Sequence, residues 1–237
     1  MRHQTGAPLN LSDIARHSFD IYRRHFNELF PIAIFAAPGV LLSALLSADL
    51  GTSGRDLALG WVYSAPLLLS TWFVNAALVA AVGDAVEGRA PALERAYRRA
   101  FRCAPRLLAA AVIEFVALLA LAATLIRVPV AVYAAVRWAF VQQRIVLRDD
   151  ALVRAFVESG RVSAGAWWRT FGTLLALAVV SAAPVFVFGG AVRAVSMVTG
   201  EALAAMMTAA IQPFTAGAVT LLYLDLESRK ESHERPA

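Results

Sequence analysis

The sequence has few of the residues that usually carry protein chemistry. Cysteine occurs once, at Cys103, which excludes a disulfide within the chain. Lysine also occurs once, at Lys230 near the C-terminus, and this position argues against Schiff-base catalysis. None of the four histidines belongs to an HExxH or another metal-binding spacing. These absences predict a protein with no catalytic metal and no cofactor.

Motifs for nucleotide binding and ester hydrolysis are missing as well. The sequence contains no GxxxxGK(S/T) phosphate loop, which argues against ATP-driven transport by this chain. It also contains no GxSxG nucleophile elbow. We therefore predict that the protein is not an enzyme, and an enzyme acting on lipid headgroups is the least favoured hypothesis.

Charged residues make up only 16% of the 237 residues, whereas hydrophobic residues make up 59%. The hydrophobic residues gather in six stretches, each near the ~20 residues that a helix needs to cross a bilayer. The stretches are residues 29–50, 57–82, 107–126, 128–147, 171–188 and 203–224. They predict an all-α membrane protein built on a six-helix transmembrane bundle.

The distribution of arginine predicts how the chain is threaded. Eighteen of the 22 basic residues lie in the N-terminal segment, the second-to-third and fourth-to-fifth connections, and the C-terminal tail, 225–237. The other connections hold only Arg55, Arg127 and Arg193, and Arg137 lies inside the fourth stretch. Because basic residues accumulate on the cytoplasmic side, we expect a multi-pass protein of the cytoplasmic (inner) membrane with both termini cytoplasmic. The turn between the third and fourth stretches is expected at residues 127–129.

Three segments outside the hydrophobic stretches have an apolar face and a charged face at helical spacing: residues 11–26, 92–106 and 151–167. We expect three cytoplasmic amphipathic helices, with Asp149 and Asp150 capping the third. The net charge of +5 could indicate nucleic acid, but arginines that flank apolar stretches favour anionic lipid headgroups. The candidate headgroup contacts are Arg16, Arg23, Arg24, Arg95, Arg98, Arg99, Arg102, Arg154 and Arg161. Docking of a soluble partner is the alternative role of these helices.

The amphipathic segments also indicate an internal repeat. LERAYRRAFR at residues 93–102 and LVRAFVESGR at residues 152–161 share leucine, arginine, alanine, an aromatic residue and a final arginine. A pair of hydrophobic stretches follows each segment. The chain therefore resembles three copies of a surface helix followed by a hairpin, related by an axis along the membrane normal.

Glu114 and Arg137 are the ionisable residues within the stretches that most need an explanation. At ~1.5 Å rise per residue their predicted depths differ by about 5 Å, so they are candidates for an intramembrane ion pair. The pair could lock the third and fourth spans together, or it could form a relay or substrate site. Asn75 and Thr71 are expected to form hydrogen bonds between helices.

Residues 9–30, residues 136–172 and LLYLDLESRKE at residues 221–231 resemble the membrane-domain family of glycerophosphoryl diester phosphodiesterases and related bacterial multi-pass proteins. The sequence departs from that pattern at Arg148, where an acid is expected, and at Glu227, where a base is expected. The resemblance implies the membrane region only. Because the chain has no histidine–arginine–glycine catalytic motif, phosphodiesterase activity is not implied.

These observations favour a non-catalytic accessory or scaffold protein. Its expected partners are anionic membrane lipids and a membrane or soluble protein, but not nucleic acid. The alternative is a small transporter or lipid flippase that uses Glu114 and Arg137. Prolines at positions 38, 66, 184 and 213 are expected to kink four of the spans, as in many transporters.

Overall fold

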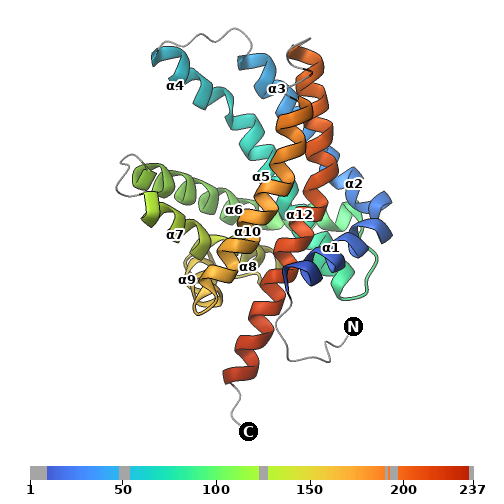
Figure 1. Ribbon diagram of the computed structural model, residues 1–237, viewed down its shortest axis with the longest axis vertical. Helices are drawn as coiled ribbons and strands as arrows, with labels where there is room; N and C mark the ends of the chain where they lie inside the picture. The colour runs from blue at the N-terminus through green and yellow to red at the C-terminus, as the bar shows by residue number, and fades with distance from the viewer. Residues whose placement is uncertain (1–9, 48–53, 123–127, 190–191, 193–196, 235–237) are drawn as a thin grey trace.

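The computed structural model describes residues 10–47, 54–122, 128–189, 192 and 197–234, and over these residues the chain forms helices and no strand. Figure 1 shows how the helices are arranged. In chain order they are α1 (Leu11–Arg24), α2 (Phe26–Ile34), α3 (Ala37–Ser47), α4 (Gly54–Tyr63), α5 (Ala65–Val86), α6 (Leu93–Ala122), α7 (Val128–Trp138), α8 (Val141–Arg148), α9 (Leu152–Ser163), α10 (Trp167–Pro184) and α12 (Met197–Glu234). A π-helical turn, η2 (Val185–Gly189), continues α10.

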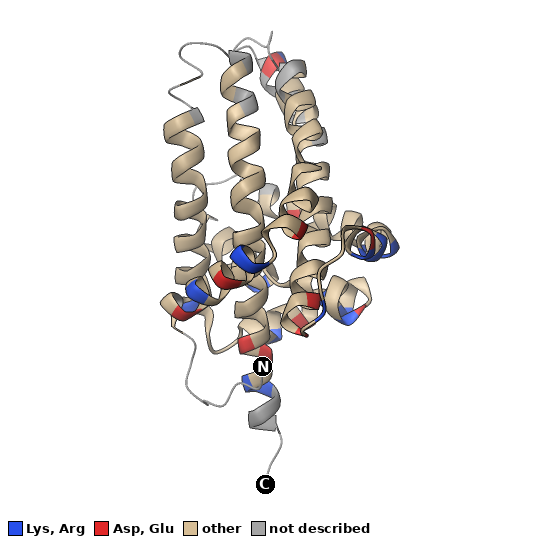
Figure 2. Cartoon of the chain, turned by 90° about the vertical axis from the view of Figure 1, so that its right-hand side faces the viewer, with Lys and Arg blue, Asp and Glu red and all other residues tan. Residues whose placement is uncertain are grey.

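Four helical segments in the described part of the chain are long and apolar enough to cross a membrane. They are Phe26–Ser43, Leu67–Val86, Trp167–Phe188 and Leu203–Lys230. They run along the long axis of the molecule, and most charged side chains gather towards the end where α12 finishes (Figure 2). We call this end of the molecule the basic end. The prediction of an all-helical membrane protein is confirmed, whereas the prediction of six spans is not.

The third and fourth predicted spans differ most from expectation. Residues 92–106 and 107–122 do not form a surface helix followed by a separate span, because α6 is one helix of 30 residues. In Figure 1, α6 and α7 run across the bundle rather than along it. Residues 123–127, which include Arg127 at the start of the predicted turn, lie outside the described residues. The other two residues of the predicted turn belong to α7, which begins at Val128 with Pro129 in its first turn.

The fourth predicted span is also interrupted. α7 ends at Trp138, and α8 begins only at Val141. Gln142, Gln143 and Arg144 follow the break and are buried against other parts of the protein. Their polar side chains would lack partners in lipid, so burial within the protein explains why this segment does not form one uninterrupted lipid-facing helix.

Proline positions divide the other predicted spans. Pro38 and Pro66 each lie in the first turn of a new helix, α3 and α5, so the first two spans are broken rather than merely kinked. Pro184 ends α10 immediately before the π-helical turn. α12 continues through Pro213 and extends from residue 197 to residue 234, well beyond the predicted 203–224.

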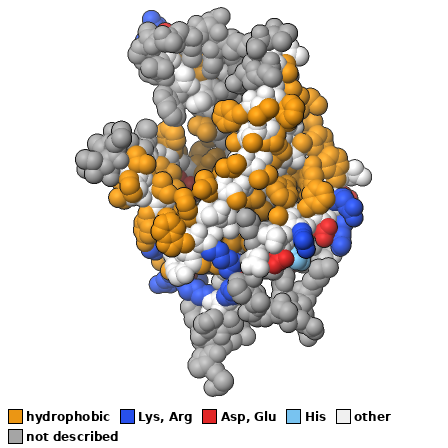
Figure 3. Space-filling model, viewed as in Figure 1, with side chains coloured by type: hydrophobic (Ala, Val, Ile, Leu, Met, Phe, Trp, Pro, Cys, Tyr) orange, Lys and Arg blue, Asp and Glu red, His pale blue; other side chains and the backbone are white. Residues whose placement is uncertain are grey.

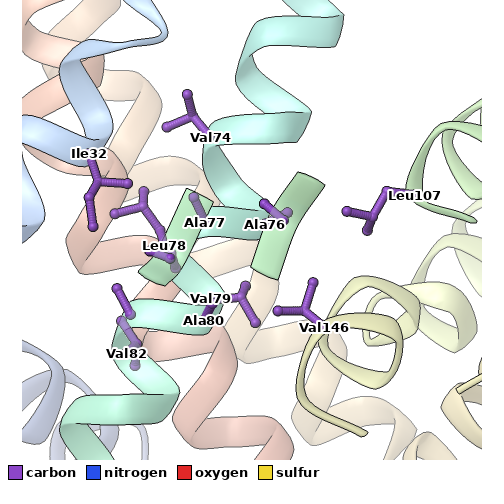
Figure 4. Close-up of a cluster of buried hydrophobic side chains, with 14 of the residues drawn as sticks. Ile32, Val74, Ala76, Ala77, Leu78, Val79, Ala80, Val82, Leu107 and Val146 are labelled. Atoms are coloured by element: carbon purple, nitrogen blue, oxygen red, sulfur yellow. The ribbon is translucent and has the colours of Figure 1, made fainter. Parts of the chain in front are cut away.

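The core is centred on α5. Residues 76–82 of α5 are all buried, and they pack among α2, α6, α8 and α12. Figure 4 shows Leu78 and its neighbours between Ile32, Leu107 and Val146. A Cβ atom on Gly83 would lie 2.7 Å from Cδ2 of Leu147, so glycine permits α5 to approach α8 closely. Alanine and glycine thus allow the close backbone contacts that are typical of membrane helices.

The outer surface is apolar over much of its area, as the side chains coloured orange in Figure 3 show. On α10 and the turn that follows, Trp168, Leu175, Val179 and Phe186 are all more than half exposed. A water-soluble protein rarely exposes contiguous apolar surface of this kind. The surface is therefore suited to contact with hydrocarbon.

Candidate functional site

A buried polar cluster joins α8 to α12 at the basic end. Nη1 of Arg144 donates hydrogen bonds to Glu227 at 2.9 Å and to the Tyr223 hydroxyl at 3.3 Å, and the same guanidinium lies 2.6 Å from Asp150. The Tyr223 hydroxyl donates to Glu227 at 2.6 Å, and Arg148 contacts the other oxygen of Glu227 at 2.6 Å. We call these five residues the Arg144 cluster.

The cluster balances its own charge. Arg144, Asp150 and Glu227 have side chains only 7–10% exposed, and each charge has an opposite partner within hydrogen-bonding distance. Pairing is necessary because an isolated buried charge is strongly unfavourable. The hydrogen bond with Glu227 raises the pKa of Arg148, so this arginine stays charged. The cluster can therefore clamp two helices, but its groups are already occupied by one another.

Arg148 of α8 and Glu227 of α12 are 79 positions apart in the sequence, and the structure places their side chains 2.6 Å apart. Sequence reasoning missed this pair, because no local pattern indicates which residues of two different helices face each other.

Two further carboxylates form ion pairs at the basic end. Asp84, at the end of α5, lies 2.7 Å from Arg89 and 3.1 Å from Arg95, although its own side chain is only 5% exposed. Asp225 of α12 is paired with Arg169 of α10 and with Arg229. The pairs of Asp84 connect the end of α5 to the start of α6, and the pair of Asp225 with Arg169 connects α12 to α10.

Asp149 and Asp150 do not cap α9, as was expected from the sequence. The N-cap of α9 is Ala151, which makes no side-chain capping bond. Asp149 ends α8 in the left-handed region, with φ 56°, and its carboxylate pairs with Arg106. Arg106 also donates to the carbonyl oxygens of Asp149 and Asp150, at 2.9 and 3.0 Å. Ion pairing with the arginines of neighbouring helices has replaced capping.

Five of the nine arginines predicted to contact lipid headgroups are engaged within the protein. They are Arg95 with Asp84, Arg98 with Glu94, Arg99 with the carbonyl oxygen of Leu147, Arg154 with Asp150 and Arg161 with Glu158. The other four, Arg16, Arg23, Arg24 and Arg102, are exposed and have no partner among the described residues. Arg23 and Arg24 line a surface hollow of about 390 Å³ together with aromatic residues of α1 and α2.

The predicted ion pair between Glu114 and Arg137 is not formed. Arg137 donates to the Tyr133 hydroxyl at 3.1 Å and lies 5.8 Å from the centre of that ring. Its guanidinium also packs on α9, where a Cβ atom on Gly160 would lie 2.6 Å from Nη2. Both residues belong to the α6–α7 hairpin, but Arg137 is directed towards α9. A similar predicted depth in the membrane was therefore not enough to indicate that the two residues pair.

Glu114 instead lines a cavity of about 210 Å³ between α5, α6 and α7. Trp72, Trp138 and Gln142 line the same cavity, together with Leu118, Ala135 and Ala139. The surface is visibly hollowed next to the α6–α7 hairpin in Figure 3. Within the described part of the chain, the Glu114 carboxylate has no hydrogen bond and no ion pair.

Amide side chains hold the wall of this cavity in place. Gln142 donates to the carbonyl oxygen of Trp72 at 2.8 Å and accepts a short hydrogen bond from Asn75. The prediction that Asn75 joins two helices is therefore confirmed. Thr71 takes part only through its carbonyl oxygen, which accepts from Gln212 at 3.3 Å, and its hydroxyl has no partner among the described residues.

The described residues contain no group of three histidine, cysteine or acidic side chains that could hold a metal ion. The chain matches no family model, no curated protein and no solved structure. The features of the protein that bear on its function are therefore the two polar sites and the apolar surface.

Proposed function

We propose that this protein is a non-catalytic scaffold or accessory protein of the cytoplasmic membrane. The observation that carries the proposal is the separation of its arginines into two sets. One set forms ion pairs or hydrogen bonds within the protein, and the other, Arg16, Arg23, Arg24 and Arg102, is exposed. Exposed arginines on α1 and α6 beside an apolar surface suit anionic headgroups and acidic groups of a partner protein.

The orientation follows the same charge distribution. We place the basic end, and with it both termini, in the cytoplasm, because exposed arginines favour the anionic inner leaflet. We place the α6–α7 hairpin within the headgroup boundary of this leaflet rather than across the bilayer. Its exposed apolar side chains, among them Val112 and Val116 of α6 and Val130 of α7, suit the acyl chains on that side. The threefold repeat of surface helix and hairpin stays a prediction.

Two measurements on the same pair of variants test the scaffold proposal. The purified protein in nanodiscs of mixed phosphatidylglycerol and phosphatidylcholine is examined by native mass spectrometry, and cross-linking in cells identifies bound proteins. Replacing Arg16, Arg23, Arg24 and Arg102 by glutamine should remove retained anionic lipid and the cross-linked partner. The matched control replaces Arg98 and Arg161, whose partners are within the chain, and should retain both. Equal retention by the two variants, or no partner of any kind with the unaltered protein, contradicts the proposal.

Transport is the second candidate function, and the cavity at Glu114 is the observation that favours it. An unpaired carboxylate at a cavity between membrane helices is typical of substrate pathways. Breaks at Pro38 and Pro66 supply positions where two spans could hinge. Lipid movement in proteoliposomes should then be abolished by Glu114→Gln but not by Arg137→Gln, since Arg137 does not face Glu114. Unchanged movement in Glu114→Gln rules this function out.

A further inference from the structure

The cavity at Glu114 combines three features that bear on what it could bind. It contains one carboxylate with no partner among the described residues, two tryptophans, and no lysine or arginine in its lining. A lone carboxylate beside an apolar surface is unfavourable unless it takes up a proton or a positive charge neutralises it. The nearest candidate from the sequence, Arg137, is held by Tyr133 and Gly160 instead.

The chemistry of the lining selects the kind of cation. A single carboxylate with one amide offers too few oxygen ligands for a divalent metal ion, which takes six or more. Tryptophan is the best aromatic partner for an organic cation, and a carboxylate beside aromatic rings is suited to an ammonium group that carries methyl or methylene groups. Gln142 is already committed to Asn75 and Trp72, so Glu114 is the polar group left to bind a ligand.

The dimensions fit such a group. An engineered cavity of ~150 Å³ in another protein holds a benzene molecule, which is similar in bulk to a trimethylammonium group. The present cavity measures about 210 Å³. It is therefore large enough for an alkylammonium group but small for a whole lipid or a bulky drug.

We propose that the cavity lined by Glu114, Trp72 and Trp138 binds an alkylammonium group, either free or as the headgroup of a zwitterionic phospholipid. The Glu114 carboxylate forms the ion pair, and the tryptophans contribute cation–π and apolar contact. The proposal goes beyond the scaffold function and does not depend on it, because none of the four exposed arginines lines this cavity. It also does not require that the bound group be transported.

The test measures binding of choline to the detergent-solubilised protein by titration calorimetry. The comparison ligand is 3,3-dimethylbutan-1-ol, which has the shape of choline without its charge. We expect saturable binding of choline and binding of the neutral alcohol weaker by about tenfold or more, since removal of one partner of a desolvated charge pair is costly. This comparison needs no variant, so it stands even if substitutions at the site unfold the protein.

Substitutions then assign the effect to the site. Glu114→Gln should weaken choline binding by about tenfold or more, whereas Glu94→Gln, at an exposed position of the same helix, should leave it unchanged. Trp138→Leu should weaken binding less than Glu114→Gln does. Saturable binding of the neutral alcohol as tight as that of choline, or choline binding that Glu114→Gln does not weaken, overturns the proposal.

A second arm distinguishes the two sources of the group. Nanodiscs of phosphatidylglycerol alone are compared with nanodiscs that also contain phosphatidylcholine or phosphatidylethanolamine, and the retained lipid is measured by native mass spectrometry. Retention of the zwitterionic lipid that depends on Glu114, without binding of free choline, identifies a lipid headgroup as the ligand. Binding of free choline with no such retention identifies a soluble amine. Absence of binding in both arms overturns the proposal while leaving the scaffold experiment unaffected.

Discussion

Glu227 shows how much one side chain of the Arg144 cluster contributes. Its two carboxylate oxygens face Arg144, Arg148 and the Tyr223 hydroxyl, and its side chain is 10% exposed. Glu227→Gln removes the negative charge and leaves two arginines close together with one acid fewer. We expect the free energy of unfolding in detergent to fall by about 3 kcal/mol, since breaking a buried ion pair costs ~3–5 kcal/mol and Arg148 is half exposed.

The matched control for this prediction is Glu94→Gln, which removes an exposed ion pair with Arg98. Exposed pairs contribute ~0–1 kcal/mol, so its effect should be small. Unfolding in increasing dodecyl sulfate, followed by circular dichroism, measures both variants. Equal loss of stability in the two variants would contradict the assignment of Glu227 as a clamp between α8 and α12.

Cys103 gives a second prediction at the scale of the residue. Its side chain is 2% exposed, and burial raises the pKa of its thiol. Because the thiolate is the reactive form, a maleimide should modify the folded protein slowly and the denatured protein rapidly. An unfolded thiol ionises near pH ~8.5. Above that pH the unfolded state loses a proton that the folded state keeps, so the thiol lowers stability as the pH rises.

Mass spectrometry after timed labelling at pH 7 and pH 9 checks the thiol prediction. The sequence contains no other cysteine, so each added label reports this position alone. Rapid modification of the folded protein at pH 7 would show that α6 opens away from α8 far more readily than its packing implies.

At the scale of the element, the position of the α6–α7 hairpin decides whether the chain crosses the membrane four or six times. Val128 begins α7 near the tip of the hairpin and is 43% exposed. If the hairpin lies at the basic side, Val128→Cys in a Cys103→Ser background should not react with an impermeant maleimide added to intact cells. Arg55→Cys, in the connection between the first two spans, is exposed and should react. Labelling of Val128→Cys as fast as that of Arg55→Cys would place the tip of the hairpin on the outer side. The third and fourth predicted spans would then cross the membrane.

Particular elements explain which predictions from the sequence succeeded. The apolar stretches of the first, second, fifth and sixth predicted spans each overlap a helical segment long enough to cross a membrane. Length and apolarity suffice there because lipid imposes the same requirement on every helix. The fourth predicted span fails because Gln142 and Arg144 are buried by contacts with α5 and α12, which no local pattern specifies.

At the scale of the whole molecule, the proposed threading of the chain does not depend on whether the α6–α7 hairpin crosses the membrane. A hairpin that does not cross removes one inward and one outward passage, so every other connection stays on its predicted side. We therefore expect green fluorescent protein fused to either end of the chain to fluoresce in cells, because it folds in the cytoplasm. An alkaline phosphatase fusion at the C-terminus should be inactive. Active phosphatase there would invert the proposed orientation.

The sequence by itself determined that the chain is helical, that several of its segments are apolar and long enough to cross a membrane, and that its arginines gather outside most of the apolar stretches. These properties depend on composition and periodicity, which each segment carries alone. Only the tertiary structure decided that Arg148 meets Glu227, that Arg137 turns from Glu114 towards Gly160, and that Glu114 faces a cavity. Such contacts join residues on different helices, and the rotation of each helix about its axis is set by packing rather than by sequence spacing.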